Sequence, residues 1–295
     1  MIIVDTIKEM QHISRNESKA GKTVAVVPTM GYLHKGHISL IEKAKSVADT
    51  VITTIFVNPA QFAPHEDFDS YPRDLERDSR LASDAGTDFL FTPLQSEMYP
   101  TRFLTSVGLK DITSKFEGVS RPDHFNGVAL IVAKLFNSTL PDIAVFGQKD
   151  LQQSLVIKKM TADLNFPIEI IISPTIRESN GLAMSSRNKY LDPEQREKAG
   201  IIFKALEEAR NVIESGERRR KQINANLHKV LRTIPEIRID YASAALSENL
   251  SEPEEFLPGD KIALIIAVYL GKTRLIDNAV VDIPTKLNQS NFIES

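Results

Sequence analysis

The sequence has no cysteine among its 295 residues, so disulfide bonds, thiolate metal sites and cysteine nucleophiles are excluded. It also lacks a long apolar run: the longest, from Ile262 to Leu270, is too short to cross a membrane as a helix. The N-terminal segment shows no basic-then-apolar pattern of a secretory signal peptide. We therefore expect a cytoplasmic protein that has no contact with a membrane.

A strong excess of charge of one sign is absent as well. Lysine and arginine number 36 and aspartate and glutamate 39, which gives a net charge of −3. This balance provides no general attraction to nucleic acid or to anionic lipid, and we expect neither as a partner. The apolar content of 42% is ordinary for a globular protein.

The stretch from Val24 to Leu40 combines a strand pattern with the start of a helix. Val24 to Val27 is an uninterrupted apolar run, typical of a strand buried on both faces of a parallel sheet. From Leu40 onward apolar residues recur at helical spacing, and a second strand-like run extends from Val51 to Val57. This pattern indicates a βαβ unit, whose first turn is where such folds bind phosphate.

His34 and His37 lie in that first turn. Three residues apart at a helix start, they point the same way, and Gly36 between them leaves the backbone open to a flat ligand. The positive end of a helix attracts anions, so the two imidazoles could donate hydrogen bonds to phosphate oxygens. The alternative is that both are surface residues near a helix cap. Two histidines without a third ligand make a poor zinc site, and we expect no protein-bound metal there.

Strand and helix patterns alternate from the N-terminus to residue 176. A first helix is predicted within residues 1–22. Further strands are predicted at 89–91, 142–146 and 168–172, and further helices at 73–85, at 128–137 and from about 150. Such alternation predicts an α/β fold with an open, Rossmann-like parallel sheet.

Four strand ends in this pattern carry polar or glycine-containing segments. Ligands of open parallel sheets bind beyond the carboxyl ends of the strands, so we expect these segments to converge on one site. They are Thr29–His37, Asn58–Gln61, Gly147–Asp150 and Pro174–Ile176.

The composition changes after Arg177. A loop of small and polar residues, Gly181–Asn188, precedes a long helix predicted to begin after Asp192 and to end at Gly216. Another helix is predicted to about residue 234, followed by strands at 237–243, 261–269 and 274–281. We predict two domains: residues 1–176 with the parallel sheet, and residues 177–295 as a smaller α+β domain.

Several side chains in the predicted segments suit the binding of a phosphorylated ligand. Lys149, at a strand end, can neutralise phosphate charge, and Asp150 can cap the next helix, bind ribose hydroxyls, or do both. Gln153 either completes a capping box with Asp150 or contacts a substrate. Gln61 has no evident structural duty. The loop Ser185–Arg187 suits a lid over a triphosphate, or else a polar linker.

The string from Pro28 to His37 resembles the His-x-Gly-His signature of nucleotidyltransferases that transfer adenylyl groups. Over its full extent it resembles, more narrowly, the pantothenate synthetase (pantoate–β-alanine ligase) family. Ala60 departs from that family's pattern, since many members have methionine there. Further blocks similar to the family follow in its order: Val57–Phe62, Tyr71–Arg73, Arg121–Gly127, Gly147–Gln153 and Gly181–Asn188.

The resemblance implies an ATP-dependent ligase of pantothenate and coenzyme A biosynthesis. Its members condense (R)-pantoate with β-alanine through a pantoyl-adenylate intermediate, and they release AMP and pyrophosphate. Mg²⁺ accompanies the ATP, and the family is typically homodimeric. Residues 1–176 would then bind nucleotide and pantoate, and residues 177–295 would act as a lid.

The same resemblance assigns roles to individual residues. His37 would be the catalytic proton donor, Gln61 would contact pantoate and β-alanine, and Gln153 would contact pantoate. The residues implied for the ATP site are Met30, His34, Gly36, His37, Gly147, Gln148, Lys149, Asp150, Ile176, Met184, Ser185, Ser186 and Arg187.

Two other functions are compatible with parts of the sequence. A related adenylyltransferase acting on a phosphorylated substrate would need cations where Gln61 and Gln153 stand. An RNA-binding module would use the basic run Arg218–Lys221, but Glu214 and Glu217 beside it and the net negative charge favour a solvated helix face.

Overall fold

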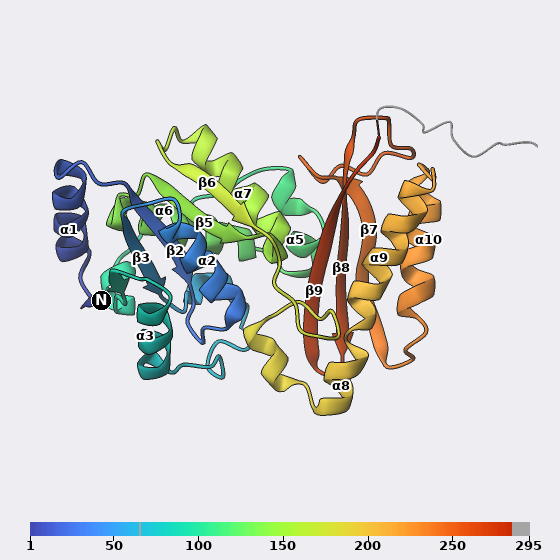
Figure 1. Cartoon of the computed structure of the whole chain (residues 1–295), viewed down its shortest axis with the longest axis horizontal. Helices are drawn as coiled ribbons and strands as arrows, with labels where there is room; N and C mark the ends of the chain where they lie inside the picture. The colour runs from blue at the N-terminus through green and yellow to red at the C-terminus, as the bar shows by residue number, and fades with distance from the viewer. Residues whose placement is uncertain (65, 285–295) are drawn as a thin grey trace, which may run out of the picture. The chain divides into compact units, whose positions relative to one another are not determined.

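The computed structural model describes residues 1–64 and 66–284, which form two compact units (Figure 1). The first unit comprises Met1–Ile176 and Met184–Ser186, and the second comprises Arg177–Ala183 and the described residues from Arg187 to 284. Three residues of the predicted lid loop thus belong to the first unit. None of the helices described is long and apolar enough to cross a membrane.

The first unit is built on a six-stranded sheet in the order β1-β4-β3-β2-β5-β6, in which every described pair of neighbours is parallel. This confirms the predicted Rossmann-like sheet. The sequence pattern missed β1, because Ile2 and Ile3 are exposed at the sheet edge and only Val4 is buried. The strands are β1 Ile2–Val4, β2 Val24–Thr29, β3 Thr50–Ile55, β4 Phe89–Phe91, β5 Ile143–Gly147 and β6 Glu169–Ser173.

Helices cover this sheet because its central strands are apolar on both faces. All four residues from Val24 to Val27 are fully buried, and α2 packs on one face through Ile41 and Ala44. The helices are α1 Ile7–Lys19, α2 Lys35–Lys45, α3 Leu75–Asp84, α4 Gln95–Met98, α5 Glu117–Ser120, α6 His124–Thr139 and α7 Leu151–Asp163. Three short 3₁₀ turns accompany them: η1 Pro59–Gln61, η2 Ile112–Ser114 and η3 Gln148–Asp150.

The strand order changes direction between β2 and β5. From β2 the chain runs through α2, β3 and α3 to β4 on one side, whereas from β5 it runs through α7 to β6 on the other. The turns that follow β2 and β5 therefore lie at the topological switch point, where open α/β sheets bind ligands. The predicted segments after β2 and after β5 meet there.

The second unit is an antiparallel sheet in the order β7-β8-β9, with α9 and α10 side by side over its apolar face (Figure 1). This confirms the predicted α+β class. The prediction of a single long helix after Asp192 is wrong, because the helix is interrupted at Ala199 and Gly200. A Cβ on Gly200 would lie 2.6 Å from the Asn180 carbonyl oxygen. The elements are η4 Ser186–Tyr190, α8 Pro193–Lys198, α9 Ile201–Glu214, α10 Arg220–Leu231, β7 Ile237–Leu246, β8 Lys261–Leu270 and β9 Thr273–Asp282.

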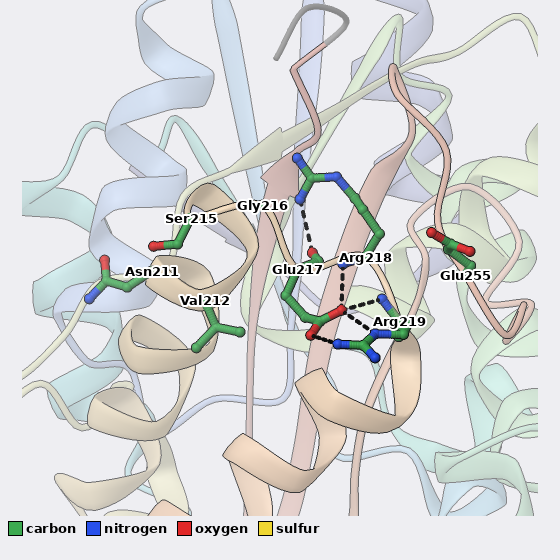
Figure 2. Close-up of a pocket in the computed structure, with 8 residues that line it drawn as sticks. All are labelled: Asn211, Val212, Ser215, Gly216, Glu217, Arg218, Arg219 and Glu255. Atoms are coloured by element: carbon green, nitrogen blue, oxygen red, sulfur yellow. Dashed lines mark hydrogen bonds and ion pairs between the residues drawn. The ribbon is translucent and has the colours of Figure 1, made fainter. Parts of the chain in front are cut away.

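A polar surface pocket lies in the second unit where α9 ends and α10 begins (Figure 2). The basic run of the RNA-binding hypothesis borders it. Arg219 pairs with Glu217 at 2.7 Å, and Arg218 donates to the Ile213 carbonyl at 2.6 Å. These cations are thus engaged within the chain. The lining residues are Asn211, Val212, Ser215, Gly216, Glu217, Arg218, Arg219 and Glu255.

Candidate active site

Between β2 and α2 the chain reverses direction at two residues whose backbone is in the left-handed region. Gly31 has φ 83° and Tyr32 has φ 50°. A Cβ on Gly31 would also lie 3.0 Å from the Ile55 side chain and 3.1 Å from an Asp78 oxygen, so glycine fits this position best. The turn delivers His34 to the N-cap of α2.

The two histidines of this turn cap the helix reciprocally. Nδ1 of His34 accepts the Gly36 N–H at 3.1 Å, and Nδ1 of His37 accepts the His34 N–H at 3.3 Å. Their rings stack with centroids 4.0 Å apart. Because each Nδ1 is an acceptor, a neutral ring carries its hydrogen on Nε2. Capping is therefore what aims the rings, and it leaves both with an Nε2–H donor.

The protonation state of His37 follows from its surroundings. Removal from water, with the nearby charges of His34 and Lys149, lowers the pKa of His37 well below its usual 6.5. The ring is consequently neutral at neutral pH and acts as a hydrogen-bond donor. A bound polyphosphate would stabilise the protonated form, so the predicted proton-donor role depends on the ligand.

A buried carboxylate on α3 holds the same turn, and sequence reasoning missed it. Asp78 is 1% exposed and accepts the N–H of Tyr32 at 2.6 Å and of Leu33 at 2.7 Å. Its neighbour Arg77 donates to the Leu33 carbonyl at 2.8 Å. Burial raises the pKa of Asp78, although these N–H donors oppose the rise. Leu75, at the start of the same helix, is 48% exposed.

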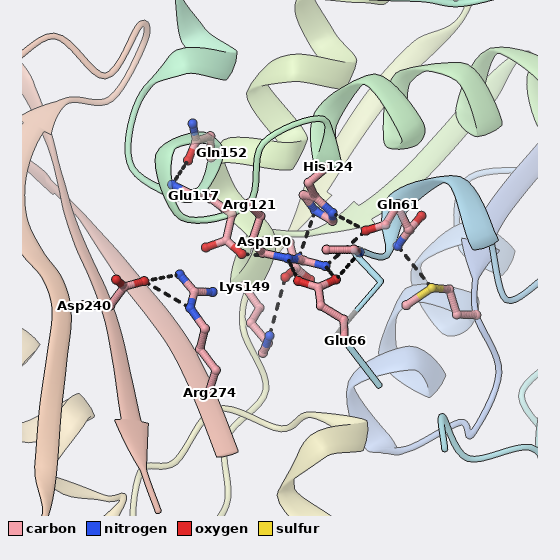
Figure 3. A network of polar contacts seen from close by, with 12 residues as sticks. Gln61, Glu66, Glu117, Arg121, His124, Lys149, Asp150, Gln152, Asp240 and Arg274 are labelled. Atoms are coloured by element: carbon pink, nitrogen blue, oxygen red, sulfur yellow. Dashed lines mark hydrogen bonds and ion pairs between the residues drawn. The ribbon is translucent and has the colours of Figure 1, made fainter. Parts of the chain in front are cut away.

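Gln61 is the last residue of η1 (Figure 3). Its amide Nε2 donates to the sulfur of Met30 at 3.2 Å, and its Oε1 accepts from Asn58 Nδ2 at 3.1 Å. Two predicted site residues, Met30 and Gln61, are thus in contact. The departure at Ala60 removes nothing here, because Ala60 is exposed and its main-chain carbonyl is what faces α6.

The segment after β5 supplies a cation and two polar side chains. Lys149 Nζ lies 3.5 Å from Asp150 Oδ1. Asp150 is the N-cap of α7 but makes no capping hydrogen bond through its side chain, so the capping box with Gln153 is wrong. Gln153 is half-buried, and its side chain forms no hydrogen bond within residues 1–64 and 66–284. Its amide is therefore available to a ligand.

The remaining predicted residues of the first unit also lie together. The Met184 N–H donates to the Ile176 carbonyl at 2.9 Å, and the Met184 Cβ would lie 3.8 Å from a Cβ on Gly36. Tyr71 Oη lies 3.4 Å from the buried Ser186 Oγ. Ser185 is in the same short segment, whereas Arg187 belongs to the second unit.

An open parallel α/β sheet with imidazole and ammonium groups in the turns at its switch point is typical of nucleotide-binding proteins. The chain belongs to the pantoate–β-alanine ligase family, whose model matches residues 2–280. The family predicted from the sequence is thereby confirmed.

Individual relatives match over nearly their whole length. Pantothenate synthetase of Thermoanaerobacter sp. (strain X514) is 50% identical over 278 residues, which cover 94% of this chain and 98% of that protein. The crystal structure of pantothenate synthetase from Thermus thermophilus has 43% identity and a TM-score of 0.89, covering 95% and 99%. Pantoate–β-alanine ligase from Francisella tularensis, complexed with beta-gamma ATP and β-alanine, has 35% identity and a TM-score of 0.76, covering 95% and 97%.

Proposed function

We propose that this chain is a pantoate–β-alanine ligase that forms AMP. It condenses (R)-pantoate with β-alanine at the expense of ATP, in pantothenate and coenzyme A biosynthesis. The observation that carries the proposal is the match to the family over residues 2–280. The related ligase solved with beta-gamma ATP and β-alanine supports the choice of substrates.

The histidine turn is the phosphate side of the proposed site. His34 and His37 each direct an Nε2–H donor from the start of α2, where the helix dipole also favours an anion. Lys149, close enough to lower the pKa of His37, adds a positive charge. We assign the ATP contacts to Met30, His34, Gly36, His37, Gly147, Gln148, Lys149, Asp150, Ile176, Met184, Ser185, Ser186 and Arg187.

The amides of Gln61 and Gln153 form the acid side. Neutral amides can hold the pantoate carboxylate and hydroxyls without a tight ion pair that would weaken the carboxylate as a nucleophile. The carboxylate oxygen attacks the α-phosphorus, the bond to the β-phosphate oxygen breaks, and pyrophosphate leaves. The β-alanine amine then attacks the acyl carbon, loses a proton and displaces AMP. Donors already aimed at the phosphates stabilise the charge that develops there.

The proposal also includes the metal ion, the oligomeric state, the cellular location and the roles of the two domains. The described residues contain no group of three or more His, Asp or Glu side chains that could hold a metal ion. Mg²⁺ would therefore enter with the triphosphate, as it does where phosphates supply its oxygen ligands. The homodimer, the cytoplasmic location and the assignment of residues 1–176 as substrate domain and 177–295 as lid are parts of the same proposal.

The direct test is AMP formation by the purified chain from ATP, Mg²⁺, (R)-pantoate and β-alanine. We expect AMP and pantothenate in equal amounts, and neither when pantoate is omitted. AMP formation that depends on a different acid would contradict the proposal.

A further inference from the structure

We propose that Arg121 and His124 are positioning residues for Gln61, an inference that rests on the function proposed above. Both side chains bind the main-chain carbonyl of Gln61, His124 through Nδ1 at 2.9 Å and Arg121 through Nη2 at 3.2 Å (Figure 3). Two donors on one carbonyl fix the peptide plane that follows Gln61. They thereby fix the direction in which its amide leaves the main chain.

The hydrogen on His124 can be assigned from its partners. A carbonyl oxygen only accepts, so Nδ1 carries the hydrogen and Nε2 carries a lone pair. Arg121 Nη1, which only donates, lies 3.2 Å from that Nε2. Removal from water and the charge of Arg121 lower the pKa of His124 to about 4, so the ring is neutral at neutral pH. Both contacts are satisfied by one tautomer.

Arg121 is itself held by two carboxylates in a nearly buried cluster. Its Nε and Nη2 bind Glu66 at 2.6 and 2.7 Å, and its Nη1 lies 3.3 Å from Glu117. Burial opposes ionisation of Glu66, but the hydrogen bonds and charge of Arg121 outweigh it and lower the pKa of Glu66. Glu66 also accepts the Ala63 N–H at 3.1 Å. The cluster thus binds the main chain at two places, the carbonyl of Gln61 and the N–H of Ala63.

The backbone of α6 packs directly against the backbone of η1, which fixes the position of the Gln61 segment. A Cβ on Gly127 would lie 2.1 Å from the Ala60 carbonyl oxygen, so only glycine allows the contact. Asn58, which also holds the Gln61 amide, donates from Nδ2 to the Gly127 carbonyl at 3.1 Å. The place of the Gln61 amide is therefore set by the first turn of α6, some sixty residues away in the sequence.

A matched pair of substitutions separates positioning from packing. The amide nitrogen of asparagine stands as many bonds from the backbone as Nδ1 of histidine, whereas that of glutamine corresponds to Nε2. His124→Asn can therefore keep the donor to the Gln61 carbonyl, and His124→Gln loses it. Calorimetry should show pantoate binding weakened roughly tenfold or more in His124→Gln but within about threefold of wild type in His124→Asn. ATP binding should be unchanged in both.

Equal loss of pantoate affinity in the two variants would overturn the proposal, as would equal loss of pantoate and ATP affinity in His124→Gln. The carbonyl ¹³C resonance of Gln61, measured without substrate, gives a second test. It should shift in His124→Gln and stay near its wild-type value in His124→Asn. If wild type binds no pantoate but the resonance behaves as expected, the proposed function has failed while the positioning has not.

Discussion

The histidine turn and the Gln61 segment, both assigned to the proposed site, are held in different ways. The rings of His34 and His37 accept the main-chain N–H groups of Gly36 and His34, all within four residues, and one α3 carboxylate, Asp78, supports the turn. Gln61 depends on residues far along the chain: His124, the first residue of α6, and Arg121, three residues before it, bind its carbonyl from sixty or more residues away. The histidines also differ in tautomer: the turn presents Nε2–H, whereas His124 donates from Nδ1.

This difference assigns separate consequences to the two regions. Substitutions that disturb the turn should act on ATP and on the first chemical step, because its donors face the proposed phosphate side. Substitutions that disturb the Gln61 segment should act on the acid substrate. A change that affected both ligands equally would show that the two regions are one structural unit.

The largest effect is expected at His37. His37→Ala should slow adenylate formation by about 10² to 10⁴-fold, the usual scale for one acid–base or electrostatic group. Single-turnover kinetics measure this step directly. His37→Gln, which keeps a donor at the place of Nε2, should recover part of the rate. A near wild-type rate in His37→Ala would refute the assignment.

Gln61→Ala should weaken pantoate binding roughly ten- to hundredfold, since a hydrogen bond to a charged group is worth about 1.5–3 kcal/mol. ATP binding should remain nearly intact, because the rings of His34 and His37 are held by main-chain contacts within their own turn and not by Gln61. Calorimetry with each ligand alone provides the comparison. An equal loss of affinity for pantoate and for ATP would contradict the assignment of separate phosphate and acid sides.

Asp78→Asn should weaken ATP binding about tenfold and leave pantoate binding unchanged. An amide can accept only one of the two N–H groups that the carboxylate now accepts, and the other is left facing a donor. Leu75→Ala, on the same helix but exposed, is the control and should change neither affinity. An unchanged ATP affinity in a folded Asp78→Asn variant would remove this carboxylate from the site.

The smallest effect concerns stability between pH 7 and 5. An unfolded imidazole titrates near 6.5 and His124 in the folded chain about 4, so between these values only the unfolded chain takes up the proton. Stability must therefore fall as pH falls. The share of His124 down to pH 5 is on the order of 2 kcal/mol. Carboxylates with a lowered pKa, such as Glu66, reduce the stability of the folded chain only when the pH falls below about 4.5.

Urea unfolding at both pH values, compared between wild type and His124→Asn, measures that share. The variant does not titrate at this position, so its stability should fall less steeply. The remaining slope should include His37, whose pKa is also lowered. Parallel slopes would contradict the neutral, buried state of His124.

The local half of this site could be predicted from the sequence, and the remote half could not. His34, Gly36 and His37 lie within one turn, so their spacing alone places them on one helix start. Strand ends that carry Gln61 and Lys149 could be expected to converge because parallel strands share one edge. No periodic pattern indicates that His124 lies against the Gln61 carbonyl, since that contact depends on how α6 packs on η1.

The fold shows the same division. Buried strands such as β2 and β8 are strongly apolar and were predicted, whereas β1 is a three-residue edge strand with one buried side chain. A local signal for Asp78 was present, because this acidic residue stands three positions after Leu75 and three before Leu81, at helical spacing from both apolar residues. The break between α8 and α9 at Gly200 depends on the close approach of the Asn180 carbonyl, a contact that no local sequence pattern indicates.

The exchange of labelled pyrophosphate into ATP tests the proposed reaction most directly. A free carboxylate is a poor acyl donor because oxide leaves poorly, and attack on the α-phosphorus turns that oxygen into part of AMP. We therefore expect exchange with pantoate present and β-alanine absent, and we expect replacement of Ser185, Ser186 and Arg187 by alanine to suppress it. Exchange that requires β-alanine, or that proceeds without pantoate, would contradict a pantoyl-adenylate intermediate.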